Sequence, residues 1–145
     1  VSIDGSRIEA VLPEDVLARL PEPLPPGFHE PMPSPDGRWL AGHYSTAQGE
    51  RIVAFPAAGG AMQRFDTVPP NAQWTGDSRG FLYIETRAGV SNLMRRLVST
   101  PAAAPVTRFT SEQIFNYAMS PDGTRLAVVR GRFNSDVVMV STVEK

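Results

Sequence analysis

The sequence predicts an all-β protein built from repeated antiparallel sheets. The phrase Ser-Pro-Asp-Gly followed by Leu-Ala occurs at residues 34–41 and 120–127, and a degenerate copy lies at residues 75–82. The aspartates of the copies are 41 residues apart, from 36 to 77, and then 45 apart, from 77 to 122. This period is typical of propeller blades, so the chain is predicted to be a β-propeller segment of about three four-stranded blades, half of a six-bladed propeller.

Each copy reads as a tight turn followed by a strand. Proline fixes φ at the first corner, aspartate accepts bonds from the backbone two residues on, and glycine takes positive φ. Turn roles are therefore predicted for Asp36, Gly37, Asp77, Asp122 and Gly123. The aspartates could instead be catalytic or bind calcium, but a calcium loop needs several oxygen ligands and each turn supplies one acid. The strands after the turns are apolar on both faces, which predicts sheets covered on both sides.

The repeat also divides the chain into segments. Residues 1–12 are predicted to be an orphan outer strand of a preceding blade, and residues 13–28 a proline-rich connector. Residues 29–67 form blade 1, residues 68–110 blade 2, and residues 111–145 blade 3, which lacks its outer strand. The expected strands lie near 30–34, 38–44, 51–56, 61–66, 71–75, 80–87, 92–98, 105–109, 114–119, 124–130 and 135–141.

Composition limits the partners that the chain can attract. It has 145 residues, a formal net charge of -1 and no cysteine. A nearly neutral chain has no bulk attraction to nucleic acid or to an anionic membrane, and no apolar run is long enough for membrane insertion. The absence of cysteine excludes a disulfide and a thiolate nucleophile. The chain starts at Val1, within the repeat pattern of a blade, so we expect it to be a piece of a longer protein.

The repeated phrase at this spacing resembles the TolB-type, WD-like β-propeller repeat of bacteria, over roughly residues 29–143. The stretch at 109–123, with Arg130-Gly131 and residues 135–138, is similar to the C-terminal propellers of acidobacterial serine/threonine kinases and winged-helix regulators. The second repeat departs from the pattern, with Thr75-Gly76 in place of Ser-Pro. The resemblance implies a non-catalytic binding module at the sensory or scaffolding end of a signalling protein. It implies an extracytoplasmic location if the parent is a membrane-anchored kinase, and a cytoplasmic one otherwise.

Residues 76–80 read Gly-Asp-Ser-Arg-Gly and match the G-x-S-x-G motif of hydrolase nucleophiles. That motif needs a helix after the serine and a later acid and histidine. A strand is expected after Ser78, and both His29 and His43 precede it, so no enzymatic activity is predicted. The alternative function is a fragment of the propeller gating domain of a prolyl-oligopeptidase-type serine peptidase, whose nucleophile would lie in a separate domain.

Polar residues recur six positions before each turn aspartate, at the predicted start of the innermost strand. They are Glu30, Asn71 and Asn116, with His29, Gln73 and Phe115 close to them in sequence. Such groups at the mouth of a propeller channel could bind a small molecule or a peptide. They could instead satisfy backbone groups where the strands begin, and this simpler alternative is favoured.

His43 takes the strand position of Ile84 and Val129 in the other repeats. Neither histidine has a cysteine or a second histidine at ligand spacing, so a partly buried, hydrogen-bonded histidine is expected and no metal or cofactor is predicted.

Five arginines could form a basic patch, but no aromatic residues alternate with them as in single-strand binders, so a solvated edge is expected. They are Arg87, Arg95, Arg96, Arg130 and Arg132. Arg95 and Arg96 are neighbours in a predicted strand, so their side chains should point to opposite faces.

Three blades are too few to close around an axis. We therefore expect a homodimer in which two copies complete a six-bladed ring, with residues 7–12 of each copy completing the last blade of the other. A protein or peptide partner, or a small ligand, is the expected class of binding partner.

Overall fold

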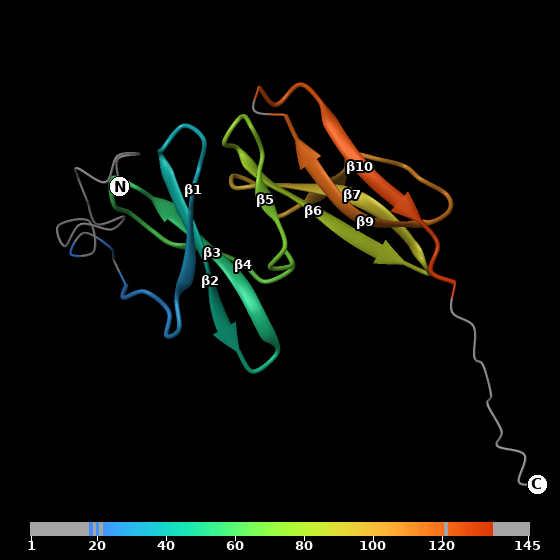
Figure 1. Cartoon of the computed structure of the whole chain (residues 1–145). Helices are drawn as coiled ribbons and strands as arrows, with labels where there is room; N and C mark the ends of the chain where they lie inside the picture. Colours follow the sequence, from blue (N-terminus) through green and yellow to red (C-terminus); the bar gives the residue numbers. More distant parts are fainter. Residues whose placement is uncertain (1–17, 19, 21, 121, 135–145) are drawn as a thin grey trace, which may run out of the picture.

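The computed structural model describes residues 18, 20, 22–120 and 122–134. Within these residues the chain forms ten strands in three antiparallel sheets, and the sheets follow one another along the chain (Figure 1). The same part of the chain contains no helix long and apolar enough to cross a membrane. The strands predicted within residues 1–12 and at 135–141 lie outside the described residues.

Blade 1 is a four-stranded meander of consecutive strands. Its strands are β1 (His29–Pro33), β2 (Trp39–Thr46), β3 (Gly49–Pro56) and β4 (Gln63–Phe65). The long hairpin β2–β3 forms the centre of the sheet, and its residues 52–55 are all buried because both faces are covered.

Blade 2 repeats this order. Its strands are β5 (Gln73–Trp74), β6 (Gly80–Arg87), β7 (Val90–Leu97) and β8 (Ala103–Pro105). Strand β8 ends where the sequence predicts the outer strand of 105–109 to begin. Thr107 and Asn92 explain this difference, because their side chains replace the ladder: Thr107 Oγ1 accepts the Leu93 N–H at 2.9 Å, and Asn92 Oδ1 accepts the Phe109 N–H at 2.6 Å.

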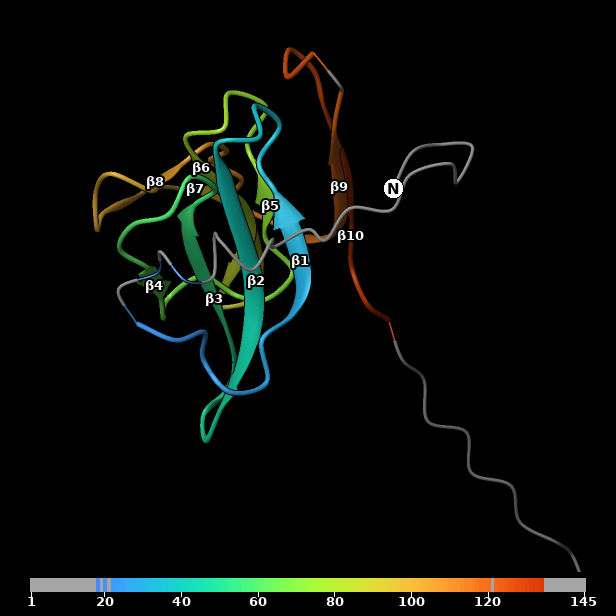
Figure 2. The ribbon, with the colours of Figure 1, turned by 90° about the vertical axis from the view of Figure 1, so that its left-hand side faces the viewer.

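Blade 3 is two-stranded in the described part of the chain, with β9 (Gln113–Met119) paired to β10 (Leu126–Gly131). Figure 2 shows the outer strands β4 and β8 on one side, and the first strands β1, β5 and β9 toward the other. Successive meanders in this arrangement are the blades of a propeller, so the predicted all-β propeller class is confirmed.

The three repeated turns have the predicted backbone. Gly37 and Gly123 have φ of 69° and 70°, and Ser78 takes the same left-handed conformation, with φ of 59°. Asp36 Oδ1 accepts the Ser34 hydroxyl at 2.6 Å and the Arg38 N–H at 3.0 Å. The aspartate therefore closes the turn on itself, as the sequence indicates.

Blades 1 and 2 pack face to face. Phe81 of β6 is completely buried, with its ring centroid 5.1 Å from that of Phe65 and 4.3 Å from that of Trp74. Ala41, Ile52, Ala54, Val68, Ala72 and Tyr83 complete this cluster. Burying one such aromatic side chain contributes about 1.5–3 kcal/mol, so the interface holds the two sheets together.

The opposite face of blade 2 packs against blade 3. Leu82 and Leu93 contact Ile114 and Tyr117, all of them buried. The Tyr117 hydroxyl donates to the Leu82 carbonyl at 2.6 Å across this interface. Burial raises the pKa of Tyr117 to about 12, so the phenol stays protonated and keeps donating.

The chain before β1 covers the remaining face of blade 1. The Phe28 ring lies 6.2 Å from that of Phe55, between centroids. It occupies the space over Gly42, where a Cβ would approach the ring to 2.4 Å. The glycine is therefore required by this close contact.

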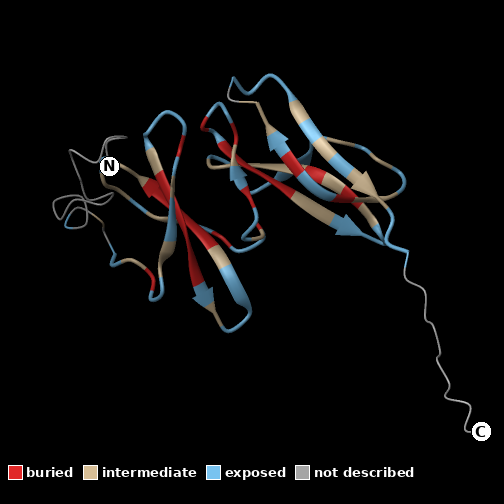
Figure 3. Cartoon of the chain, in the orientation of Figure 1, coloured by how far each residue is buried: buried red, intermediate tan, exposed pale blue. Residues whose placement is uncertain are grey.

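Blade 3 keeps one face open in the described structure (Figure 3). Phe115, Val129 and Phe133 are 44%, 58% and 84% exposed. The prediction that the strand after each turn is covered on both faces is correct for β2 and β6 and wrong for β10. The reason is that no described sheet follows β9 and β10, whereas blades 1 and 2 each have a neighbour.

Candidate functional site

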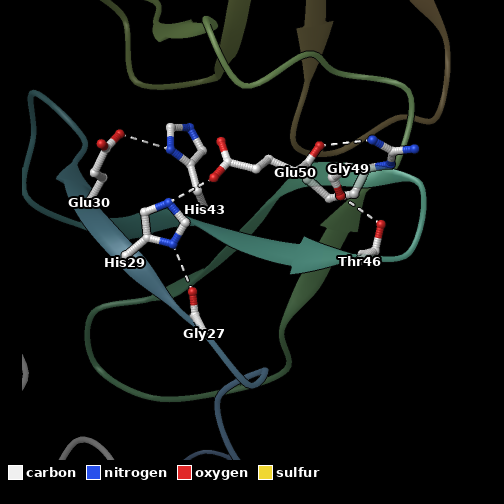
Figure 4. A network of polar contacts seen from close by, with 8 residues as sticks. Gly27, His29, Glu30, His43, Thr46, Gly49 and Glu50 are labelled. Atoms are coloured by element: carbon white, nitrogen blue, oxygen red, sulfur yellow. Dashed lines mark hydrogen bonds and ion pairs between the residues drawn. The ribbon is translucent and has the colours of Figure 1, made fainter.

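Two histidines and two glutamates gather where β1 begins (Figure 4). His29 of β1 pairs with His43 of β2, so both side chains project from one face of the sheet. Glu50 of β3 lies two residues before Ile52, the partner of His43, and projects from this face as well. Glu30 reaches His43 from a bulge, because the β1–β2 register shifts beyond His29. We call these four residues, His29, Glu30, His43 and Glu50, the histidine–glutamate cluster.

Two contacts of equal length hold the cluster together. His29 Nε2 lies 3.1 Å from Glu50 Oε1, and His43 Nδ1 lies 3.1 Å from Glu30 Oε2. The two imidazole rings meet edge to face with centroids 5.7 Å apart. The His43 side chain is 7% exposed and that of Glu30 is 72% exposed, so the cluster runs from the interior to the surface. Donor atoms of His29, His43 and Glu50 all lie within 4.8 Å of one another, so these three residues could hold a metal ion.

The backbone orients both ends of the cluster. His29 Nδ1 donates to the Gly27 carbonyl oxygen at 2.7 Å. This hydrogen bond raises the pKa of His29 above 6.5, and the negative charges of Glu50 and Glu30 add to the effect. Glu30 has φ of 49°, a left-handed conformation that is uncommon outside glycine. Figure 4 shows its carboxylate facing His43 from this position.

The other residues predicted at the channel mouth lie on blades 2 and 3. The Asn71 carbonyl oxygen accepts the Tyr117 hydroxyl at 3.4 Å, and Asn116 Oδ1 accepts the Tyr117 N–H at 2.8 Å. Gln73 is exposed in β5, and Phe115 lies on the open face of blade 3. Among the described residues, no hydrogen bond joins Asn71, Gln73 or Asn116 to the histidine–glutamate cluster. Of the predicted residues, the structure thus places His29 beside Glu50 and Glu30 beside His43, and the shared channel mouth stays a prediction.

A groove of about 640 Å³ lies between blades 1 and 2, at the end where the repeated turns are found. Its lining includes Asp36, Arg38, Trp39, Asp77, Arg79 and Leu97. The two turns contact each other directly, since the Asp36 N–H donates to Ser78 Oγ at 3.0 Å. Sequence reasoning missed this groove because it forms between turns that lie far apart in the chain; the recurrence of the turn is the signal that could have revealed it.

Three of the five arginines predicted to lie on a solvated edge are partly buried instead. Arg95 and Arg96 do point to opposite faces: Arg95 pairs with Asp77, and Arg96 lies over the Phe65 ring at 5.4 Å. Arg130 lies 3.5 Å from the centroid of the Phe109 ring. All three arginines are partly buried, and the guanidinium groups of Arg96 and Arg130 cover aromatic rings.

Arg87 and Arg132 are exposed, and Arg87 pairs with Glu85 at 2.9 Å. A continuous basic surface is therefore not formed by these five residues.

The chain matches no protein-family model and no curated protein sequence. Its fold is similar to that of a solved protein of Agrobacterium tumefaciens that carries a provisional TolB name. The two chains are 19% identical, with a TM-score of 0.49, over 78% of this chain and 46% of the other. This chain thus spans less than half the length of that protein.

Proposed function

We propose that this chain is a non-catalytic β-propeller module that binds a partner through the open face of blade 3. The observation that carries the proposal is the exposure of Phe115, Val129 and Phe133 together on that face. The rings of Phe115 and Phe133 are in edge-to-face contact, with centroids 5.7 Å apart, so they form one apolar surface. Clustered apolar side chains on one face mark interaction surfaces, whereas single exposed ones do not.

The repeat explains which partner fits this face. The residues five and seven positions after each turn aspartate face the next blade, as Leu82 and Ile84 of blade 2 do toward blade 3. Ala127 and Val129 are the equivalent residues of blade 3, and both are exposed. Another blade is thus the complementary surface. For the isolated chain we propose that a second copy supplies it and that two copies form a ring.

Where this chain is part of a longer protein, we propose a sensory or scaffolding role in a bacterial signalling protein. The similarity of residues 109–123 to propellers that follow a kinase or a winged-helix domain supports this part of the proposal. In that setting, further blades of the same protein would cover the open face of blade 3. Ligand capture at the channel mouth, near Glu30, Asn71 and Asn116, belongs to the same proposal.

Ser78 has a structural role that accounts for its G-x-S-x-G context. It is buried in the turn between β5 and β6, and its Oγ accepts the Asp36 N–H. We therefore expect a fluorophosphonate probe to leave Ser78 unlabelled. Stoichiometric labelling of Ser78 would refute the non-catalytic part of the proposal.

Two matched valine variants test the proposed surface. Val129 on the open face and Val106 beside β8 are 58% and 48% exposed, so lysine should be tolerated at both sites in the single chain. In sedimentation equilibrium, Val129→Lys should run as one chain, because an ammonium group cannot be buried unpaired in an apolar interface. Val106→Lys should associate like the wild type. Equal association of the two variants would refute the surface.

A further inference from the structure

The hydrogen-bond geometry of the histidine–glutamate cluster calls for a proton or a metal ion between His29 and Glu50. The Gly27 carbonyl can only accept, so His29 Nδ1 carries the proton. In the neutral imidazole, Nε2 is then a lone pair facing Glu50 Oε1 at 3.1 Å, which is also an acceptor. Two acceptors at this distance repel each other unless a proton or a metal ion lies between them.

His43 has a related difficulty in every protonation state. Its Nδ1 faces the Glu30 carboxylate, and its Nε2 is buried without a hydrogen-bond partner among the described residues. With a proton on Nε2 alone, the lone pair of Nδ1 faces a carboxylate. With a proton on Nδ1 alone, the buried Nε2 lone pair has no donor, and with both protons the buried Nε2–H has no acceptor. A metal ion at Nδ1 removes the repulsion between this nitrogen and Glu30, and the ring keeps its proton on the buried Nε2.

We propose that His29, His43 and Glu50 bind a Zn²⁺ ion, with Glu30 beside His43 as a further carboxylate ligand or as the group that orients the ring. Two imidazoles and one glutamate are a recurrent donor set for zinc with an open fourth position. The proposal rests on the described geometry of blade 1, independently of the proposed self-association.

The distances suit this ion. Ligand atoms about 2.0–2.1 Å from a tetrahedral zinc lie roughly 3.3 Å from one another. The His29–Glu50 pair is already at 3.1 Å, and no two donors of the trio are more than 4.8 Å apart. The His29 and Glu50 side chains are 39% and 45% exposed, so both have room to close the remaining gap. The bond from His29 Nδ1 to the Gly27 carbonyl is the outer contact that ligating histidines ordinarily make.

The composition makes the assignment testable. The chain has two histidines, both in this cluster, and no cysteine, so imidazole or thiolate ligation of zinc elsewhere in the chain is excluded. Calorimetric titration of the full chain with Zn²⁺ alone should show one ion bound per chain. The ring nitrogens of both histidines should shift on saturation in a ¹⁵N NMR spectrum. The absence of saturable binding at millimolar Zn²⁺ would overturn the proposal.

Surface variants separate a metal site from a structural ion pair without threatening the fold. His29→Gln and Glu50→Gln should each abolish measurable binding, and Glu30→Gln should weaken it about 10–100-fold. The control is Glu22→Gln, because Glu22 is also ion-paired, to Arg64, and is 47% exposed. It should leave the affinity unchanged. Binding that survives His29→Gln, or that Glu22→Gln weakens as much as Glu50→Gln does, would contradict the site.

Discussion

Blades 2 and 3 share one repeat but differ in what covers them. Leu82 of blade 2 and Ala127 of blade 3 each stand five residues after the turn aspartate, on the face toward the next blade. Leu82 is 2% exposed because blade 3 covers it, whereas Ala127 is exposed. The sequence pattern around the two is alike, so burial here depends on the presence of a neighbouring blade. The open face of blade 3 thus has the residue pattern of a buried blade face. We propose that another blade covers it when the module binds its partner.

The largest expected difference is in the stability lost when a side chain is shortened on the covered face of blade 2 or on the open face of blade 3. Leu82→Ala should lower the free energy of unfolding by about 2–5 kcal/mol, because it leaves a cavity between two sheets. Val129→Ala should change the stability of the single chain by about 0.5 kcal/mol or less, because Val129 is exposed. Urea unfolding of dilute protein measures both. Equal losses would show that the two faces are equally buried.

Substitution of the turn glycine should have the same effect on stability in blade 1, which is covered, and in blade 3, which has an open face. Gly37 and Gly123 have nearly the same positive φ, and a Cβ at Gly37 would meet no atom within 4 Å. Valine at either site should therefore cost about 1–3 kcal/mol through backbone strain alone. Asparagine, which tolerates this conformation, is the control and should cost less. Asp77→Ala in the degenerate turn should also cost less than either valine. An unchanged urea midpoint for Gly123→Val would refute the turn assignment.

The smallest effect concerns pH. Hydrogen bonds from Ser120 and then Thr124 lower the pKa of Asp122 from 3.8 to about 2. The folded pKa is the lower one, so the turn's contribution to stability is complete above pH 3.8 and is lost as the pH falls toward 2. NMR titration of the Asp122 carboxyl carbon should show this midpoint, and Ser120→Ala should raise it. A midpoint near 3.8 in the native chain would contradict the hydrogen bonds.

Local signals in the sequence were sufficient for the blades and their turns. The recurring aspartate locates each tight turn, and the apolar pair four and five residues after it locates the central strand, because both signals come from residues that are close in the chain. The end of β8 could not be predicted, since the side chains of Asn92 and Thr107 take over its hydrogen bonds from 15 residues apart.

The histidine–glutamate cluster lay beyond sequence reasoning for a related reason. His29 and His43 become neighbours only through the β1–β2 register, and Glu50 joins them from β3. Their spacing in the sequence does not suggest ligands of one site. The prediction of a solvated edge was wrong for Arg95 and Arg96, because strand position gives the direction of these side chains but does not reveal the Asp77 and Phe65 that they contact.

The mass of the wild-type chain in solution tests the central claim most directly. If the open face of blade 3 is a docking surface for another blade, light scattering at micromolar concentration should give twice the chain mass of 15.8 kDa. Removing residues 1–12 should weaken this dimer if that segment completes the last blade of the other copy. A species with the mass of one chain would contradict the account.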